Sequence, residues 1–315
     1  MQNNPKLNIL GGDYEFTLQV SGTWQGIDCT YIPSDLLLVY AKILNFKPFE
    51  VSEFSLSNFT MMRDRNINDM VAIPVFVNRG FRHGIMWVKK ESDINEVSQL
   101  KGLKIGIRDY SMTAAVWLRG TLLDEYGIHW SDLDWYANKT QRFPAPERAN
   151  LTLLDNDPEE MLLNDELDVY IAPRPKDLKK PFYERKLRPL INNVQEVEKN
   201  YFLRTGIYPI NHCVVIHKDI YKKIQNVAPA IFEAYTYSKK IALQRKIGST
   251  FMPWGERNWS DVMNIFNNDP FPFGLNESNI NNVGTLIGYL FEQELISEKP
   301  DIEELFLKES LNWQE

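Results

Sequence analysis

Short apolar runs alternate along the chain with longer segments in which apolar residues recur every three or four positions. The short runs predict strands, and in the first part of the chain they lie at 6–12, 27–33, 69–77 and 83–90. Residues 34–46 open on Ser-Asp and then show helical spacing, which predicts a capped helix. Residues 49–66 predict a short strand to about Glu53, followed by a helix capped by Ser55 or Ser57.

The same alternation continues to the end of the chain. Residues 103–128 predict a strand, a turn and a helix that ends near Gly127, and 158–175 predict a helix followed by a strand. A polar, proline-containing stretch at 138–158 predicts a loop after a strand at 132–137. Further on, 211–218 predict a strand, 219–246 a helix and 279–296 a late helix. Helices that flank short apolar strands imply parallel sheets covered on both faces.

Composition and charge narrow the class of protein. A chain of 315 residues with 43% hydrophobic and 24% charged residues is typical of a soluble globular protein of two lobes. The N-terminus lacks the basic and apolar regions of a signal peptide, and no run of about 18 apolar residues occurs, so we expect a cytoplasmic protein without a membrane segment. A net charge of -7 argues against nucleic acid as a partner. We expect both cysteines, Cys29 and Cys213, to be buried and unpaired.

A cationic cluster between two predicted strands is the strongest candidate for chemistry. The segment VNRGFRHGIMW places Arg79, Arg82 and His83 within five positions. An arginine fork binds a carboxylate at two points, and histidine exchanges a proton near neutral pH. The alternative is a solvated basic loop that forms surface ion pairs.

Other candidates lie where predicted strands end, because ligands collect at the carboxyl ends of strands in α/β sheets. The glycines that precede Tyr14 could let the backbone approach a ligand closely. The alternative is that Tyr14 lies in a plain turn. Glu53 could accept a phenolic hydrogen bond, and Ser55 could bind an anion or only cap a helix.

A second group of candidates lies further along the chain. Tyr110, Ser111, Met112 and Thr113 form a strand-to-helix turn whose free N–H groups favour an anion, although ordinary capping explains them equally well. Arg174 follows a strand and could reach a carboxylate or form an ion pair between lobes. His212, at the start of a strand, is either a core histidine or a catalyst.

Motifs for other chemistries are absent from the sequence. No GxSxG, P-loop or GxGxxG occurs. Glu53, His83 and His212 could in principle bind a metal, but no close ligand spacing supports this. We therefore predict no metal and no cofactor, without excluding a divalent metal.

Eight segments occur in the same order as in one known family, over essentially the whole chain. They are GGDYE, VSEFSLSNF, IPVFVNRGFRH, YSMTAAVWLRG, LLDEYGI, YFLRTGIYPINHCVVIHKDIY, FPFGLNESN and DIEELF. The chain resembles the 4,5-dihydroxyphthalate decarboxylase family. This resemblance implies an α/β fold like that of type II periplasmic binding proteins, a two-lobed clamshell with mixed sheets flanked by helices. Lobe one would comprise 1–103 and 209–315, lobe two 104–208, and the ligand would lie in a cleft between them.

The resemblance also implies a reaction, the conversion of 4,5-dihydroxyphthalate to 3,4-dihydroxybenzoate and carbon dioxide in aromatic degradation. Arg79 or Arg82, with the turn at 111–113, would hold the retained carboxylate, and Arg174 would close from lobe two. His83 or His212 would protonate the ring, and Glu53 would take a proton from the para hydroxyl. An apolar wall of Phe54, Phe76 or Phe81 would face the departing carboxylate.

Two other readings remain open at this point. One is a solute-binding protein or sensor that holds a small aromatic carboxylate without catalysis, since the same clamshell serves both roles. The other is a different ligand, a hydroxybenzoate or a pyrimidine-like molecule. Association into a homo-oligomer is compatible with the sequence.

Overall fold

The structure is a computed structural model that describes residues 4–247 and 252–315. The chain forms two compact units. Unit one comprises Met1–Arg79, His212–Asn281 and Pro300–Glu315, and unit two comprises Gly80–Asn211 and Asn282–Lys299. We expected the chain to pass between lobes near Leu103 and Tyr208. The first division instead follows Arg79, because the strand at 86–89 pairs within the sheet of unit two.

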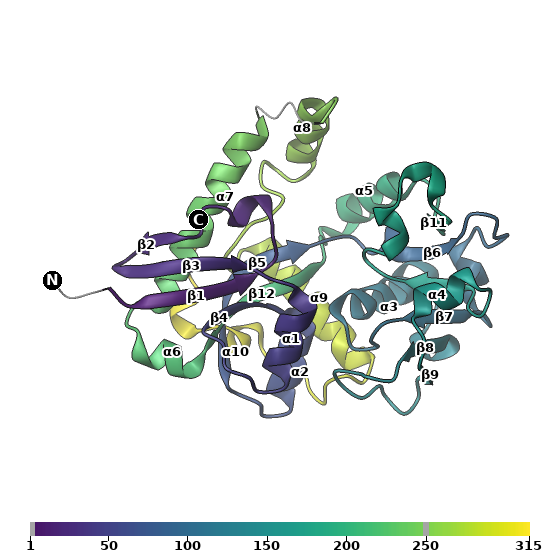
Figure 1. The fold of residues 1–315 in the computed structure, drawn as a ribbon, viewed down its shortest axis with the longest axis horizontal. Helices are drawn as coiled ribbons and strands as arrows, with labels where there is room; N and C mark the ends of the chain where they lie inside the picture. The colour runs from purple at the N-terminus through teal and green to yellow at the C-terminus, as the bar shows by residue number, and fades with distance from the viewer. Residues whose placement is uncertain (1–3, 248–251) are drawn as a thin grey trace. The chain divides into compact units, whose positions relative to one another are not determined.

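Unit one is built on a six-stranded mixed sheet (Figure 1). In spatial order its strands are β2 (Gly22–Trp24), β3 (Ile27–Pro33), β1 (Lys6–Gly11), β4 (Val51–Ser55), β12 (Ile210–His217) and β5 (Met70–Arg79). Strand β1 runs parallel to β3 and β4, whereas β2 is antiparallel to β3 and β12 is antiparallel to β4. The antiparallel β12 is the strand that brings distant sequence next to β4.

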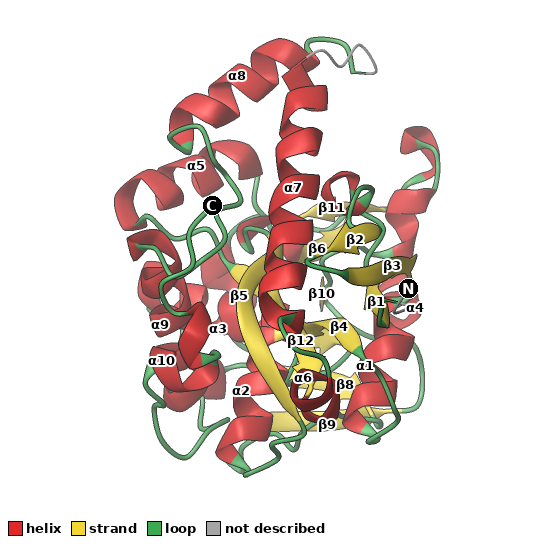
Figure 2. Cartoon of the chain, turned by 90° about the vertical axis from the view of Figure 1, so that its left-hand side faces the viewer, coloured by secondary structure: helices red, strands yellow, loops and turns green. Residues whose placement is uncertain are grey.

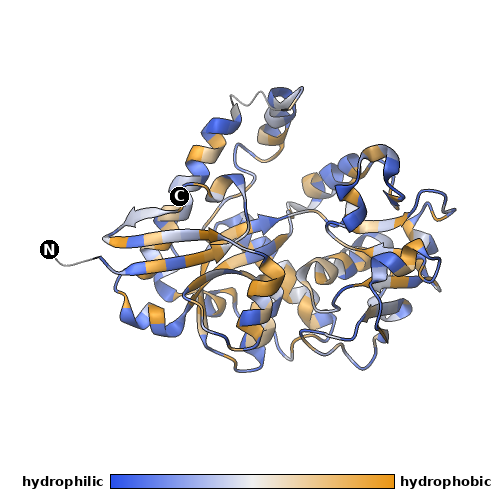
Figure 3. Cartoon of the chain, viewed as in Figure 1, coloured by the Kyte–Doolittle hydropathy of each residue, from blue (hydrophilic) through white to orange (hydrophobic). Residues whose placement is uncertain are grey.

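Unit one also contains helices, most of which pack on this sheet. They are α1 (Leu36–Leu44), α2 (Leu56–Asp64), α6 (Lys218–Lys223), α7 (Val227–Ile247), α8 (Gly255–Ile265) and α10 (Ile302–Leu305). Figure 2 shows α7 running across the strands, and its residues Ala230, Ile231 and Ala234 pack on Ile9, Ile73 and other buried strand residues. Figure 3 shows that hydrophobic and hydrophilic residues alternate along the helices and that hydrophobic residues are frequent in the strands. Burial of these apolar side chains stabilises the unit.

The predicted helix at 219–246 divides into α6 and α7. Asn226 adopts a positive φ of 60°, a conformation that a continuous helix does not contain. The single-helix prediction was therefore wrong at this point.

Unit two is built on a second six-stranded mixed sheet. Its order is β11 (Leu187–Pro189), β6 (Met86–Lys89), β10 (Val169–Ile171), β7 (Lys104–Ile107), β8 (Asp134–Asn138) and β9 (Asn150–Leu154). Strands β10, β7, β8 and β9 are parallel, and β6 is antiparallel to β10 and β11. The helices are α3 (Thr113–Tyr126), α4 (Pro158–Leu163) and α5 (Val194–Thr205), while α9 (Glu277–Glu292) spans the boundary at Asn281.

Strand β9 was missed in the sequence, where 138–158 predicted a loop. Residues 150–154 are exposed or half-buried because β9 is an edge strand, so their pattern is weak. Its pairing with β8 supplies the regular structure that local sequence does not indicate.

Both sheets are mixed, as the resemblance implies, and not purely parallel as the apolar strands alone suggested. Cys29 and Cys213 are buried free thiols, which confirms that prediction. Among residues 4–247 and 252–315, no helix is both long and apolar enough to cross a membrane.

Candidate active site

Glu53 is the centre of a hydrogen-bonded cluster in unit one. Its carboxylate lies in β4, is fully buried, and accepts hydrogen bonds from three parts of the chain. The Gly12 N–H donates to Oε2 at 2.8 Å, and the Tyr14 hydroxyl donates to Oε1 at 2.8 Å. His212 Nδ1 lies 2.5 Å from Oε1. A buried carboxylate is costly unless such donors satisfy it, so the cluster accounts for its position.

The pairing of β12 with β4 places His212 beside Glu53. His212 lies opposite Ser55, and Glu53 is two residues before Ser55 on the same face, so the two side chains are diagonal neighbours. The imidazole keeps 17% of its side-chain surface exposed, and its edge packs against Tyr40 with ring centroids 5.3 Å apart. Nδ1 donates to the carboxylate in this network, which leaves Nε2 as the basic nitrogen of the neutral ring. No residue described in the structure hydrogen-bonds Nε2.

Tyr14 extends the cluster toward the loop after β1. Its hydroxyl donates to Glu53 and accepts from Asn78 Nδ2 at 3.0 Å. Burial, followed by the charge of Glu53 and the hydrogen bond to it, raises the pKa of Tyr14 well above its usual value. The phenol therefore stays protonated and acts as a donor. Asn78 was missed in the sequence, although it directly precedes the Arg79–His83 segment that drew attention.

The two glycines before Asp13 give the tyrosines room. A Cβ atom on Gly12 would lie 2.4 Å from Tyr14 Cζ, and one on Gly11 would lie 2.3 Å from the Tyr31 hydroxyl. Tyr31 in turn donates to the Gly12 carbonyl at 2.6 Å. The close approach predicted at these glycines occurs, and its partners are protein rings.

The two arginines of the cationic segment belong to different units and bind carbonyl oxygens. Arg79, in unit one, donates to the Pro272 carbonyl at 3.0 Å and to the side-chain oxygen of Asn279. Arg82, in unit two, donates to the side-chain oxygen of Asn211, and burial lowers its pKa to about 10. Both side chains are buried, so neither forms the solvated basic loop of the alternative reading.

His83 is a buried histidine of unit two, whereas Glu53 and His212 belong to unit one. Its ring packs edge-on against Tyr201 at 5.0 Å, and neither ring nitrogen has a hydrogen-bond partner among the described residues. Burial lowers the pKa of His83 to about 4. It is therefore neutral near pH 7, a state that does not suit a general acid.

The turn before α3 holds its side chains in local contacts. Tyr110 is fully buried beneath the guanidinium of Arg119, which lies 3.9 Å from its ring centroid. Ser111 donates from its N–H and its hydroxyl to Asp109 Oδ1, at 2.8 and 2.6 Å. Met112 is the N-cap residue of α3, and Thr113 is the first helical residue.

Two further candidates have simple local descriptions. Ser55 caps α2 by accepting from the Asn58 N–H at 3.2 Å, which is the capping alternative that the sequence left open. Arg174 is exposed and follows β10 in unit two. In the part of the chain that the structure describes, no three His, Cys, Asp or Glu side chains are grouped to hold a metal ion.

Two curated proteins support the resemblance seen in the sequence. The 4,5-dihydroxyphthalate decarboxylase of Comamonas testosteroni is 26% identical over 293 residues, which cover 87% of this chain and 88% of that protein. The protein of the same name from Pseudomonas putida is 29% identical over 187 residues, covering 55% and 72%. No family model matches the chain. The predicted resemblance is thus confirmed by these two relatives.

Solved structures confirm the fold class. The aliphatic sulphonate binding protein SsuA of Escherichia coli superimposes with a TM-score of 0.55 at 14% identity, covering 98% of this chain and 99% of that one. SsuA of Xanthomonas axonopodis pv. citri gives 0.58 at 10% identity, with 98% and 99% coverage. The desulfurization enzyme DSZB gives 0.50 at 11% identity, with 98% of both chains covered. The chain has the fold of periplasmic binding proteins, and one neighbour with this fold is an enzyme.

Proposed function

We propose that this protein is a carboxy-lyase that converts 4,5-dihydroxyphthalate to 3,4-dihydroxybenzoate and carbon dioxide. Two relatives carry that name. The observation that carries the proposal is the pair formed by buried Glu53 and partly exposed His212. A ligand-binding protein needs no such proton-transfer pair in order to hold and release a ligand.

The reaction needs a base near the ring hydroxyls. Removal of the proton from the hydroxyl para to one carboxylate sends electron density to the carbon that bears this carboxylate. That carbon then takes a proton, the C–C bond breaks and carbon dioxide leaves. Overall one proton is consumed from solvent, and the hydroxyl recovers its own proton from the base.

His212 is the base, and its Nε2 accepts the proton of the para hydroxyl. Glu53 holds Nδ1–H, fixes the tautomer and stabilises the imidazolium that forms, as a carboxylate does behind a catalytic histidine in general. This arrangement changes the role expected for Glu53, because its two oxygens already accept three hydrogen bonds and are poorly placed to take a substrate proton.

The charge of Glu53 also orients the ligand. A buried negative charge repels a substrate carboxylate and attracts hydroxyl donors, so the hydroxyl edge of the ring faces the Glu53–His212 pair. Tyr14 remains a neutral donor beside it. Arg82, Arg174 and the turn at 111–113 remain predicted carboxylate contacts.

Turnover of 4,5-dihydroxyphthalate by the purified protein tests this proposal, with 3,4-dihydroxybenzoate followed by chromatography and carbon dioxide by a coupled assay. His212→Asn should lower kcat by about 10²-fold or more. His217→Asn is the matched control, since His217 ends the same strand and caps α6. The assay covers pH 5 to 9, roughly the range in which histidine changes charge, with and without divalent metals. Absence of turnover by the wild type under all these conditions would refute the proposed enzymatic function.

A binding function without chemistry is the second candidate, because two of the structural neighbours are binding proteins by name. Calorimetry that shows tight binding of a small aromatic carboxylate with no product formed would favour it. Location in the cytoplasm and association into a homo-oligomer stay predictions, which cell fractionation and light scattering would check.

A further inference from the structure

We propose that Phe16 and Phe271, together with Tyr14, form an aromatic subsite that contacts the flat ring of the ligand next to Glu53 and His212. This inference rests on the proposed function and names the part of the site that selects an aromatic substrate. Phe16 stacks on Tyr14 with ring centroids 5.3 Å apart and planes inclined by 15°. Phe271 follows, with its centroid 5.8 Å from Phe16.

All three rings are only half-buried, so each keeps surface that a ligand can contact. The hydroxyl of Tyr14 reaches Glu53, which places this stack at the proton-transfer pair within unit one. The apolar residues first expected to line the site differ from these. Phe54 and Phe76 are fully enclosed in the core and cannot touch a ligand.

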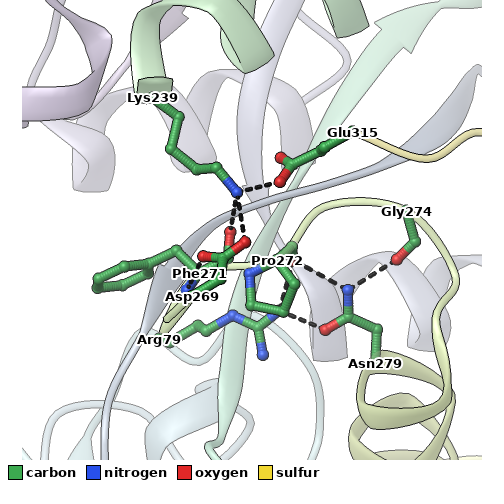
Figure 4. Close-up of polar contacts among 8 residues, drawn as sticks. All are labelled: Arg79, Lys239, Asp269, Phe271, Pro272, Gly274, Asn279 and Glu315. Atoms are coloured by element: carbon green, nitrogen blue, oxygen red, sulfur yellow. Dashed lines mark hydrogen bonds and ion pairs between the residues drawn. The ribbon is translucent and has the colours of Figure 1, made fainter. Parts of the chain in front are cut away.

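A buried lysine holds the loop that carries Phe271. Lys239, in α7, donates to Asp269 Oδ2 at 2.9 Å and to the Phe271 carbonyl at 3.0 Å, and it also pairs with the Glu315 carboxylate (Figure 4). Asp269 accepts the Phe271 N–H through its other oxygen at 2.9 Å. In Figure 4 the ring of Phe271 points away from these polar groups.

A buried arginine holds the next residues of the same loop. Arg79 donates to the Pro272 carbonyl and to Asn279, and Asn279 Nδ2 donates to the carbonyls of Pro272 and Gly274 at 2.9 and 2.7 Å (Figure 4). Asn279 is fully buried. Arg79 is then a positioning residue for this loop and not the carboxylate ligand that the sequence predicted.

The cost of these contacts supports a functional loop. Two cationic side chains, Lys239 and Arg79, are buried away from water, and their hydrogen bonds hold the loop segment 269–274 between α8 and α9. A plain connection between helices needs no buried charge. Fixing Phe271 against Phe16 gives a rigid, pre-formed aromatic surface, and a rigid surface distinguishes a planar ring from a puckered one.

Calorimetry with two probes tests the subsite, namely 3,4-dihydroxybenzoate and its saturated-ring analogue 3,4-dihydroxycyclohexanecarboxylate. The wild type should bind the aromatic probe about tenfold more tightly, and Phe16→Leu and Phe271→Leu should each reduce this preference to roughly twofold to threefold. Phe49→Leu is the matched control, a half-buried phenylalanine at the other end of the same sheet. Thermal unfolding checks that each variant is folded.

The outcomes separate the two proposals. A preference that is unchanged in both folded leucine variants, or is absent in the wild type, overturns the aromatic subsite even if turnover is observed. A preference that falls in both variants, while the wild type fails to turn over 4,5-dihydroxyphthalate, supports the subsite and refutes the decarboxylase. Lys239→Met should lower the preference as Phe271→Leu does, and a folded Lys239→Met protein with the full preference contradicts the role of the loop.

Discussion

Replacement of Glu53 by Gln should change the tautomer of His212 as well as remove a charge. The Gly12 N–H is a backbone donor fixed 2.8 Å from Oε2, so the glutamine oxygen must occupy that position. The glutamine NH₂ group then faces the Tyr14 hydroxyl and His212 Nδ1, where Oε1 had accepted two hydrogen bonds. The hydroxyl can turn, but Nδ1 must become an acceptor. The proton of neutral His212 therefore moves to Nε2, which can no longer act as a base.

The size of the effect follows from these contacts. Loss of the general base should lower kcat by about 10²-fold to 10⁴-fold. Loss of the charge-assisted hydrogen bonds to a fully buried carboxylate should lower the free energy of unfolding by about 1–3 kcal/mol, which leaves most domains folded. Alanine at this position would leave three buried donors without an acceptor, so Gln is the cleaner change.

Turnover and a two-dimensional ¹H–¹⁵N spectrum of the imidazole rings measure the two consequences. The chain has four histidines, and the signal that His212→Asn removes identifies His212. We expect the proton on Nδ1 in the wild type and on Nε2 in Glu53→Gln. Glu50→Gln is the control, because Glu50 precedes the same strand and accepts only the Asn8 N–H among the hydrogen bonds described for its side chain. Full activity in folded Glu53→Gln, or lost activity with the tautomer unchanged, would refute the reasoning.

Two other predictions concern stability. Burial lowers the pKa of His83 from 6.5 to about 4, so the folded state resists protonation. Above pH 6.5 the imidazole is neutral in both states and costs no stability. Between pH 6.5 and 4 only the unfolded state takes up the proton, so the free energy of unfolding falls as the pH drops. His83→Phe should remove about 3 kcal/mol of this loss in urea titrations across that range, and an equal loss in both proteins would contradict it. Gly12→Ala should displace Tyr14 and lower both activity and melting temperature, since the new Cβ would lie 2.4 Å from the ring. Gly288→Ala in α9, where a Cβ meets no atom within 4 Å, should leave the melting temperature unchanged or higher, and equal effects of both changes would rule out the clash.

The local sequence determined most elements and several members of the site. Apolar runs and helical spacing located the strands and helices, and the Asp35 and Ser55 caps lie where polar residues precede apolar ones. Glu53, Tyr14 and His212 were all named as candidates from their positions at predicted strand ends. These features depend on neighbours within a few residues, which periodicity and capping preferences report directly.

Partners were decided only by the tertiary structure. Glu53 and His212 are 159 residues apart, and they meet because β12 pairs antiparallel with β4, a choice of strand order that no local pattern contains. Arg79 was expected to bind a ligand carboxylate, but the fold buries it against Pro272 and Asn279, about 200 residues away in the chain. Sequence therefore indicates which side chains are able to do chemistry. Strand order and burial decide which of them meet, because a buried polar group takes whatever partner the packed chain brings to it.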